Sequence, residues 1–341
     1  MNRVKAVLVE GGRAVVLEVE RPKIGKGEVL VRLAACGLCG TDVERIRGGY
    51  TAGRQVIGHE ASGVVEEVGE GVEWLRRGDR VVPHHHTNCG DCYYCLNGSP
   101  TMCPEYRRHH FDPGGFSEYF RVPEFIVRRG AIYKVPGGLS LEEASLTEPL
   151  ACCLRALERS GVRQGWTVAV FGVGPMGAIF LELLRSLGCE AVAVDVKESR
   201  LRFADSLGVR ALDASRADVD REVRELSGGR GADLSIIATG SSAAIVTAIR
   251  STRNGGTVCL FGLPPRGTKV DQDFSELLVR EVSLISSNAA TEEEMVEAIR
   301  ILEERRVRAS RLITHRFPIE RFEEALRVFE SGDGMKVLIT P

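Results

Sequence analysis

Three glycines follow a short apolar run near the middle of the chain, in the segment WTVAVFGVGPMGAIFLELL. Gly172, Gly174 and Gly177 have the spacing G-x-G-x-x-G, and a stretch that can form a helix starts among them. Short apolar runs alternate with helical stretches from residue 164 to residue 288. Because strands that alternate with helices line up side by side in one direction, this region predicts a doubly wound parallel sheet.

The same turn predicts a site for a dinucleotide. Glycine permits the tight turn and lets the backbone approach a pyrophosphate, while the start of the helix, at Pro175 and Met176, supplies positive potential. Asp195 closes the next apolar run, about 20 residues on, where an acid is expected to bond the adenosine ribose. Its charge would repel a 2'-phosphate, so we expect NAD rather than NADP. Arg200 stands close enough to weaken this preference, or it belongs to a solvated helix start.

The first 150 residues have a different pattern, in which strand-like runs are separated by glycine and proline. They predict a barrel-like β domain with long loops. The tail from Thr291 alternates helix and strand, and we expect it to fold back onto this first domain. Since 341 residues are too many for one ordinary core, we expect one domain from 1–150 with 288–341 and a second from 151–287.

The composition excludes several classes of partner. Acidic and basic residues nearly cancel, 47 against 45, so no field of one sign favours nucleic acid or an anionic membrane. No apolar run approaches the roughly 20 residues that span a bilayer, and the amino terminus lacks the pattern of a secretory signal. We therefore expect a cytoplasmic protein. Ten cysteines in a reducing compartment indicate metal binding or catalysis more than disulfides.

Four of the cysteines form a lobe near residues 84–105, with the spacing C-x2-C-x2-C-x7-C at Cys89, Cys92, Cys95 and Cys103. Four thiolates this close in sequence can complete a tetrahedral shell around zinc and leave no position for water, which predicts a structural zinc site. The segment has little apolar material with which to fold otherwise. Free loop cysteines are the alternative, and a nucleic-acid-binding ribbon is disfavoured because the lobe has hardly any lysine or arginine.

A catalytic zinc ion keeps a coordination position open and normally has three protein ligands. Cys39 in CGLCGTD and His59 in VIGHEASG are the best candidates. Glu148 in LTEPLACC is a candidate for the third, because it stands at the junction of the two expected domains. Three consecutive histidines at 84–86 precede the lobe, and we expect them to be solvated or to support the ligands only.

Together these residues resemble the zinc-dependent medium-chain dehydrogenases, a branch of the alcohol dehydrogenase superfamily. The resemblance covers nearly the whole chain and implies an α/β protein with a GroES-like β-barrel catalytic domain and a Rossmann domain. Segments around Glu148 and His315 and the closing GMKVLI resemble the polyol (sorbitol or iditol) and threonine dehydrogenases. The signature G-H-E-x2-G-x5-G-x2-V is matched by Gly58, His59, Glu60, Gly63, Gly69 and Val72.

The resemblance implies that Cys39 and His59 bind the catalytic zinc, and that Glu60 or Glu148 completes the shell. Asp42 would accept a hydrogen bond from the ring of His59 and so fix its tautomer. Cys36 matches no ligand position, so we expect a packed thiol there, with a redox pair as the alternative.

The resemblance also implies a proton path. Thr41 would receive the alcohol proton and pass it toward the ribose of the cofactor. Many relatives end this relay with a histidine where this chain has Glu44, so that Glu44 or a chain of water molecules would carry the proton out.

The expected activity is hydride transfer between a secondary alcohol, a polyol or sugar, and NAD, with NADP possible. Zinc would act as a Lewis acid on the substrate oxygen, and two zinc ions per chain are expected. An L-threonine 3-dehydrogenase-like reaction and a non-catalytic zinc and nucleotide sensor are the alternatives. The family suggests a dimer or tetramer, through apolar edge strands at 256–262 or 282–288. Side chains that could line the pocket are Arg45, Tyr50, His110 and Tyr119.

Overall fold

The computed structural model describes residues 3–48 and 56–341, and it divides the chain into two units. Unit 1 comprises Met1–Ala151, Ala290–Arg305 and Ala309–Pro341, and unit 2 comprises Cys152–Ala289 and Arg306–Arg308. The sequence assigns all of 288–341 to the first domain, whereas the structure places residues 288–289 and Arg306–Arg308 in unit 2.

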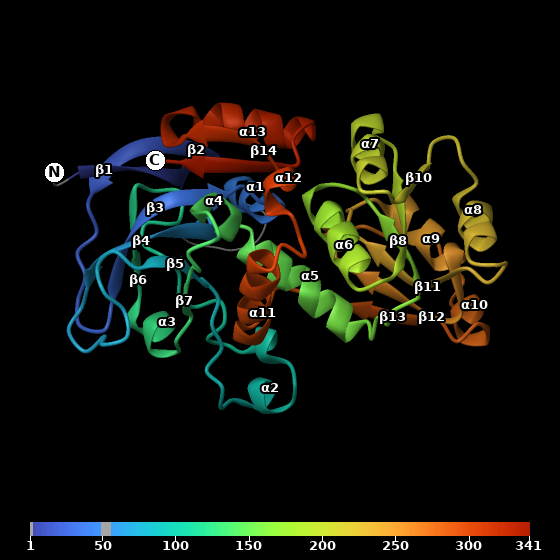
Figure 1. Ribbon diagram of the computed structural model, residues 1–341, viewed down its shortest axis with the longest axis horizontal. Helices are drawn as coiled ribbons and strands as arrows, with labels where there is room; N and C mark the ends of the chain where they lie inside the picture. The colour runs from blue at the N-terminus through green and yellow to red at the C-terminus, as the bar shows by residue number, and fades with distance from the viewer. Residues whose placement is uncertain (1–2, 49–55) are drawn as a thin grey trace. The chain divides into compact units, whose positions relative to one another are not determined.

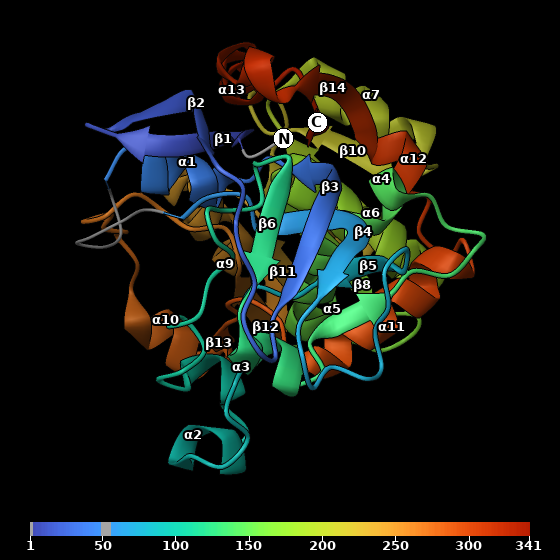
Figure 2. The ribbon, with the colours of Figure 1, turned by 90° about the vertical axis from the view of Figure 1, so that its left-hand side faces the viewer.

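Unit 1 is built on a mixed sheet whose strands follow the order β14-β15-β3-β4-β5-β7, with β6 paired to β3. Figure 2 shows β6, β3 and β4 side by side. A separate antiparallel pair is formed by β1 and β2. The strands are β1 (Arg3–Glu10), β2 (Arg13–Glu20), β3 (Val29–Gly37), β4 (Glu60–Val68), β5 (Arg80–Pro83), β6 (Tyr119–Val122), β7 (Ile132–Lys134), β14 (Ile313–Pro318) and β15 (Lys336–Thr340).

The tail joins this sheet at its centre, because β15 pairs with β3 in antiparallel register, with Ile339 opposite Cys36. The apolar faces of β3 and β4 pack on a cluster that includes Phe116, Phe120 and Phe322. Unit 1 also contains helices that the strand-like pattern of residues 1–150 does not predict. They are α1 (Gly40–Ile46), α2 (Tyr93–Leu96), α3 (Glu124–Arg128) and α4 (Leu141–Ala144), with a short 3-10 turn at η1 (Pro100–Met102). The tail contains the two helices expected from the sequence, α11 (Glu292–Glu303) and α13 (Phe322–Ser331), together with α12 (Ala309–Leu312) and a 3-10 turn at η2 (Ile319–Arg321).

Unit 2 is a parallel sheet in the order β10-β9-β8-β11-β12-β13, and helices α6 and α9 lie on opposite sides of it (Figure 1). The doubly wound prediction is therefore confirmed. Its strands are β8 (Thr167–Phe171), β9 (Glu190–Asp195), β10 (Arg210–Asp213), β11 (Ala232–Ile237), β12 (Thr252–Leu260) and β13 (Ser283–Ser286). Its helices are α6 (Pro175–Ser186), α7 (Glu198–Ser206), α8 (Val219–Leu226), α9 (Ser242–Ser251) and α10 (Phe274–Val279), and α5 (Thr147–Arg159) starts in unit 1 and ends in unit 2.

Two features of this sheet bear on the expectations from sequence. The order reverses at β8, which pairs with β9 on one side and β11 on the other, so the glycine turn after β8 lies at the switch point of the sheet. The segment 256–262 is not an edge, because β12 pairs with both β11 and β13, and only β13 of the two candidate strands lies at an edge. Across the described part of the chain, no helix combines the length and apolar character that a membrane crossing requires.

Candidate metal centres and the dinucleotide turn

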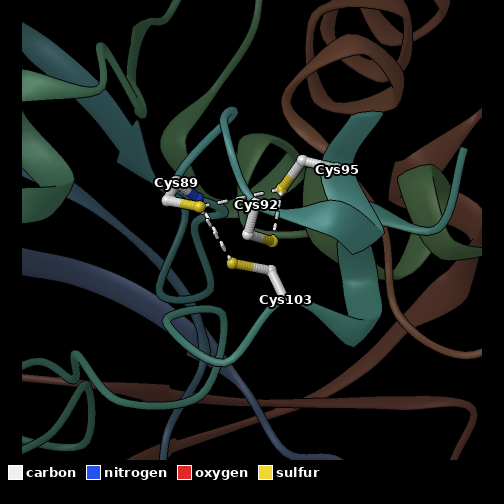
Figure 3. A group of neighbouring side chains, drawn as sticks. All are labelled: Cys89, Cys92, Cys95 and Cys103. Carbon is white, nitrogen blue, oxygen red and sulfur yellow. Dashed lines mark hydrogen bonds between the residues drawn. The ribbon is translucent and has the colours of Figure 1, made fainter. Parts of the chain in front are cut away.

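The sulfur atoms of the four-cysteine lobe converge on one point (Figure 3). Sγ of Cys92 lies 3.5 Å from Sγ of Cys95, and Sγ of Cys89 lies 3.5 Å from that of Cys103 and 4.0 Å from that of Cys95. All four lie within 4.8 Å of one another. Thiolates at ~2.3 Å from a central zinc ion stand ~3.8 Å apart, so the group fits one tetrahedral ion with no position to spare.

The lobe owes its shape to local backbone contacts more than to packing. Helix α2 begins directly after Cys92, and the backbone N–H of Cys95, followed by the neighbouring thiols of Cys95, Cys89 and Cys103, lowers the pKa of the Cys92 thiol to about 7. This sulfur therefore becomes a thiolate more readily than an ordinary cysteine. Tyr93 and Leu96 remain 75% and 72% exposed. Since the lobe buries little of its own apolar surface, a bound ion would stabilise it in place of a core.

A second group of metal-binding side chains lies where β3 ends and β4 begins. Gly37, the last residue of β3, pairs with Glu60, the first residue of β4. This register brings Cys39, which follows β3, next to His59 and Glu60, and their ligand atoms lie within 4.8 Å of one another. A thiolate, an imidazole and a carboxylate are zinc ligands, and three of them leave the fourth tetrahedral position open.

Asp42 is fully buried behind His59 and ties this group together. Its Oδ1 lies 3.1 Å from Nδ1 of His59 and accepts the N–H of Gly58 at 2.9 Å, while its Oδ2 accepts the N–H of Cys39 at 3.1 Å. Burial alone would raise the pKa of Asp42, but His59 and the Gly58 N–H outweigh it and hold this pKa below its usual value. The ionised carboxylate fixes the ring and leaves Nε2 for a metal.

Glu60 is only 1% exposed and forms an ion pair with Lys336, which is 2% exposed. Burial raises the pKa of Glu60, and the charges of Lys336 and His59 oppose part of the rise. Glu148, in the first turn of α5, is also buried and acts on Glu60 through its charge. The described residues group Glu60, and not Glu148, with the cysteine and the histidine.

The expected proton path starts at α1, where Thr41 and Glu44 are both exposed. Oγ1 of Thr41 lies 3.9 Å from Sγ of Cys39, beside the three-residue group. Glu44 is on the same helix and is not part of that group. Cys36 is fully buried in β3, and burial raises the pKa of its thiol well above the usual value, which suits a packed side chain.

The three consecutive histidines after β5 are buried, which rules out the alternative that they are solvated and leaves the alternative that they support the ligands. His84, His85 and His86 are 0%, 4% and 8% exposed. The backbone N–H of His84 donates to the carbonyl of Ala131 at 2.8 Å, which extends the pairing of β5 with β7 and draws the loop inward. Burial lowers the pKa of all three rings, that of His84 to about 3. The rings of His85 and His59 lie 5.0 Å apart, between centroids.

The other candidates for the pocket are dispersed. His110 lies 6.2 Å from His86, between ring centroids, and belongs with the histidines. Arg45 donates to the carbonyl of Val56 at 2.6 Å. Tyr119 instead packs under the guanidinium of Arg21, 4.8 Å from its ring centroid, on strand β6. Tyr50 lies outside the described residues.

The glycine motif forms the turn between β8 and α6. Gly172 has a φ of +92°, which residues with a side chain rarely adopt. A β-carbon on Gly177 would lie 1.9 Å from the carbonyl oxygen of Gly172, so only glycine lets the helix approach the turn this closely. Gly174 precedes α6, and Pro175 and Met176 form its first two positions. The free backbone groups and positive end of the helix thus open at the switch point, where a phosphate can bind.

Asp195 ends β9 with its carboxylate held against this turn. Its Oδ2 accepts the N–H of Val173 at 2.7 Å, and its Oδ1 accepts those of Val196 and Lys197 at 2.7 and 2.9 Å. Nη1 of Arg200 lies 3.4 Å from the same carboxylate. Arg200 therefore faces the turn, and a solvated helix start does not describe it.

Comparison with known proteins decides the family. Residues 25–131 match the alcohol dehydrogenase GroES-like domain, and residues 175–304 match the zinc-binding dehydrogenase family. An alcohol dehydrogenase of Geobacillus stearothermophilus is 34% identical over 304 residues, which cover 86% of each chain. The chain belongs to the zinc-dependent alcohol dehydrogenase superfamily. The expected GroES-like and Rossmann domains are confirmed with it.

Other relatives of this dehydrogenase represent both branches expected from sequence. A sorbitol dehydrogenase of Halalkalibacterium halodurans is 30% identical over 336 residues, 97% of this chain and 96% of the relative. An L-threonine 3-dehydrogenase of Bacillus subtilis is 30% identical over 359 residues, 100% of this chain and 99% of the relative.

Among solved structures of similar dehydrogenases, one contains NADP and another contains NADH. A putative zinc-binding dehydrogenase of Sinorhizobium meliloti 1021, bound to NADP, superposes with a TM-score of 0.90 at 28% identity and 100% coverage of both chains. A short chain alcohol dehydrogenase of Escherichia coli CFT073, complexed with NADH, has a TM-score of 0.88 at 27% identity, again over 100% of both chains.

Two features of the site, the buried Lys336 and the buried histidines at 84–86, are not predicted from the sequence. Lys336 stands in the apolar segment MKVLITP, and a lone charge inside an otherwise apolar strand is a signal that it has a buried partner. The histidines at 84–86 directly follow the proline of DRVVP, which signals the end of a strand, whereas the backbone pairing continues at His84, so nothing in the sequence indicates their burial.

Proposed function

We propose that this dehydrogenase transfers a hydride between a secondary alcohol, specifically a polyol or sugar, and NAD, with one zinc ion at Cys39, His59 and Glu60 and a second in the four-cysteine lobe. The observation that carries the proposal is the three-residue group itself. It joins three different zinc ligands and leaves one position for a substrate oxygen, as catalytic sites do. Sorbitol dehydrogenase among the relatives supports the substrate class.

A zinc ion held by these residues would supply a Lewis acid for the oxygen of the alcohol. The chain's own residues do the rest. Asp42 holds His59 in one orientation through the 3.1 Å contact. The hydroxyl oxygen of Thr41 would accept the proton of the alcohol while its own hydroxyl proton passes toward the ribose of the cofactor, and Glu44 or water would carry a proton out from there. Hydride transfer requires the nicotinamide of the dinucleotide to reach the substrate carbon at this site.

Glu60 is our choice for the third ligand, because it already lies with Cys39 and His59. Its ion pair with Lys336 gives the carboxylate a second partner when it leaves the metal. Glu148 is close enough to act on Glu60 by charge, and it is the alternative ligand.

NAD is the preferred cofactor in this proposal, bound at Gly172, Gly174 and Gly177. The support is Asp195, whose carboxylate is held in place by three backbone N–H groups at the end of β9 and would repel a 2'-phosphate. Arg200, at 3.4 Å from that carboxylate, reduces the repulsion and makes NADP a weaker second cofactor.

A panel assay tests the function. Zinc-loaded protein is mixed with NAD or NADP and a series of polyols, aldoses, threonine and simple secondary alcohols, and NADH or NADPH absorbance is followed. We expect the polyols with NAD to be fastest. Threonine as the best substrate would favour the amino-alcohol reaction, which the L-threonine 3-dehydrogenase among the relatives supports as the second candidate. Flat traces across the whole panel would refute both.

We also propose that the protein is a cytoplasmic homo-oligomer, a tetramer or dimer. Strand β13 lies at a sheet edge, and Leu278, Val279 and Leu284 beside it or on it are 79%, 83% and 40% exposed, which favours cover by a second copy. The thiolates of both metal groups bind zinc only while reduced, which favours the cytoplasm. Sedimentation velocity of the Leu278→Glu variant against wild type tests the assembly, since a protein that is monomeric in both refutes it.

A further inference from the structure

A cluster of histidines adjoins the Cys39 group in unit 1. We call His84, His85, His86 and His110 the histidine cluster. The ring of His85 lies 5.0 Å from that of the candidate ligand His59, 3.5 Å from that of His86 and 6.0 Å from that of His84, between centroids. His110 stands 6.2 Å beyond His86. The cluster is thus linked to the candidate ligand His59 through His85.

Six of the eight ring nitrogens of the cluster are buried without hydrogen bonds among the described residues. Within the described residues, no partner is found for either nitrogen of His84 or His85, for Nε2 of His86 or for Nδ1 of His110. Buried polar groups in folded proteins are almost always hydrogen-bonded. So many unsatisfied nitrogens in one place, beside an incomplete metal shell, indicate that something polar occupies this region.

A metal ion does not fit these nitrogens. The described residues form only two groups whose ligand atoms converge for an ion, the four cysteines and the Cys39 group, and no histidine of the cluster belongs to either. An apolar ligand fits no better, because it would leave these six nitrogens unpaired.

The chemistry of the cluster matches hydroxyl groups. An uncharged imidazole offers one donor and one acceptor, and so does each hydroxyl of a polyol. The charges that act most on His85 and His86 are those of other histidines and Arg45, and none of them is a carboxylate that could hold an ammonium group. Water can bond the nitrogens in the free protein and be displaced by substrate hydroxyls that reproduce its hydrogen bonds.

We propose that His85, with His86 and His110 behind it, recognises the hydroxyl groups next to the reacting carbon, so that the enzyme selects polyols and vicinal diols over simple and amino alcohols. This inference rests on the proposed function, because it takes the reacting oxygen to lie at the Cys39 group. His85 is then the specificity residue closest to the reacting carbon. The other histidines of the cluster form hydrogen bonds with hydroxyl groups farther along the substrate.

The test uses two substrates that differ by one hydroxyl, butane-2,3-diol and butan-2-ol, with the His85→Phe variant. Phenylalanine keeps a planar ring and removes both nitrogens. We expect wild type to prefer the diol, and His85→Phe to lower kcat/KM for the diol about tenfold, the value of one hydrogen bond of about 1.4 kcal/mol, while that for butan-2-ol stays within about twofold. A preference for the diol that survives the substitution overturns the proposal.

Three further measurements separate this proposal from the proposed function. His86→Phe provides a second variant in case His85→Phe does not fold, and we expect a similar loss confined to hydroxyl-rich substrates such as xylitol. His315→Phe, on strand β14, is the matched control and is expected to change neither substrate. Xylitol binding to the zinc-loaded protein, followed by saturation-transfer NMR, is independent of turnover. Binding that His85→Phe weakens about tenfold supports the cluster even if no alcohol is oxidised, and binding that it leaves unchanged refutes it.

Discussion

The two metal-binding groups of unit 1 are built in opposite ways. The four cysteines come from one loop of 15 residues, Cys89 to Cys103, and their sulfurs form a closed set of equal donors. Cys39, His59 and Glu60 are donors of three kinds, brought together by the pairing of β3 with β4. The first group can hold an ion with little help from the fold, whereas the second exists only because two strands are in one register.

The surroundings of the two metal-binding groups also differ, because one group is exposed and the other is buried among charged side chains. The four-cysteine lobe exposes apolar side chains such as Tyr93 and Leu96 and depends on local backbone contacts. The Cys39 group is surrounded by buried charges, with Asp42 behind the histidine and Lys336 on the glutamate. A closed shell needs only its ligands, but an open one needs outer partners that hold each ligand in place while substrate and product exchange.

The largest effect is expected from removing a ligand of the open group. Cys39→Ala should lower kcat/KM on the order of a thousandfold or more, because a Lewis acid contributes several kcal/mol to the transition state. The zinc content should fall from two ions per chain to one, with little change in melting temperature. Cys189→Ala, a half-buried cysteine of unit 2 outside both groups, is the control. Elemental analysis with steady-state kinetics checks the result. If the variant keeps both ions, Cys39 is not a zinc ligand.

Removing a ligand of the closed group should act on stability instead. Cys92→Ala is expected to cost about 4 kcal/mol in the lobe, as losses of a structural metal do, and to leave the Cys39 group occupied. Limited proteolysis should then cut between residues 84 and 105, and zinc should again fall to one ion per chain. If the lobe resists protease without its ion, then packing and not metal holds it, and the contrast between the two groups fails.

The fold could be predicted wherever one strand or helix contains its own pattern. The strands around the glycine turn have near-continuous apolar runs, which is how β8, β9, β11, β12 and β13 were predicted. Strand β10 was missed because RALD contains only two apolar residues and is held in the sheet by pairing with β9. Helix α1 was missed because its seven residues are too few to show a helical period, and its start is fixed by Asp42 reaching back to Cys39.

The two metal-binding groups also differ in how far the sequence predicts them. The four-cysteine group follows from spacing alone, since all its ligands lie in one short loop. Cys39 and His59 were candidates from their residue types alone, but Glu60 was reached only through the resemblance to a family, because the spacing does not indicate which acid joins the cysteine and the histidine. The pair of Glu60 with Lys336 was not predicted at all, since it joins the start of β4 to the start of β15, and only the order of strands in the sheet brings these together. The burial of the histidine cluster depends likewise on β5 and β7.

A smaller effect distinguishes the outer partners of the two groups. Asp42→Asn keeps the size of the side chain but removes the charge that fixes His59, and outer partners of this kind contribute 10–100-fold, as an order of magnitude, to metal affinity. We expect zinc at the Cys39 group to be lost to a chelator about that much more readily, with the four-cysteine ion unaffected. Asp79→Asn, which removes a surface ion pair with Lys134, is the control. Equal weakening of both ions would mean that Asp42 supports the fold and not one ligand.

The smallest effect is expected at the apolar surface of the lobe. Leu96 is 72% exposed on α2, one residue after a candidate ligand, so it contributes little buried area. If the ion holds the lobe, Leu96→Ser should change the free energy of unfolding by no more than about 0.5 kcal/mol, the usual range for a surface substitution. Thermal unfolding of the zinc-loaded variant beside wild type measures this. A loss well above that range would show that another surface covers Leu96 in solution, and the lobe would then owe its stability to packing as well as to its four thiolates.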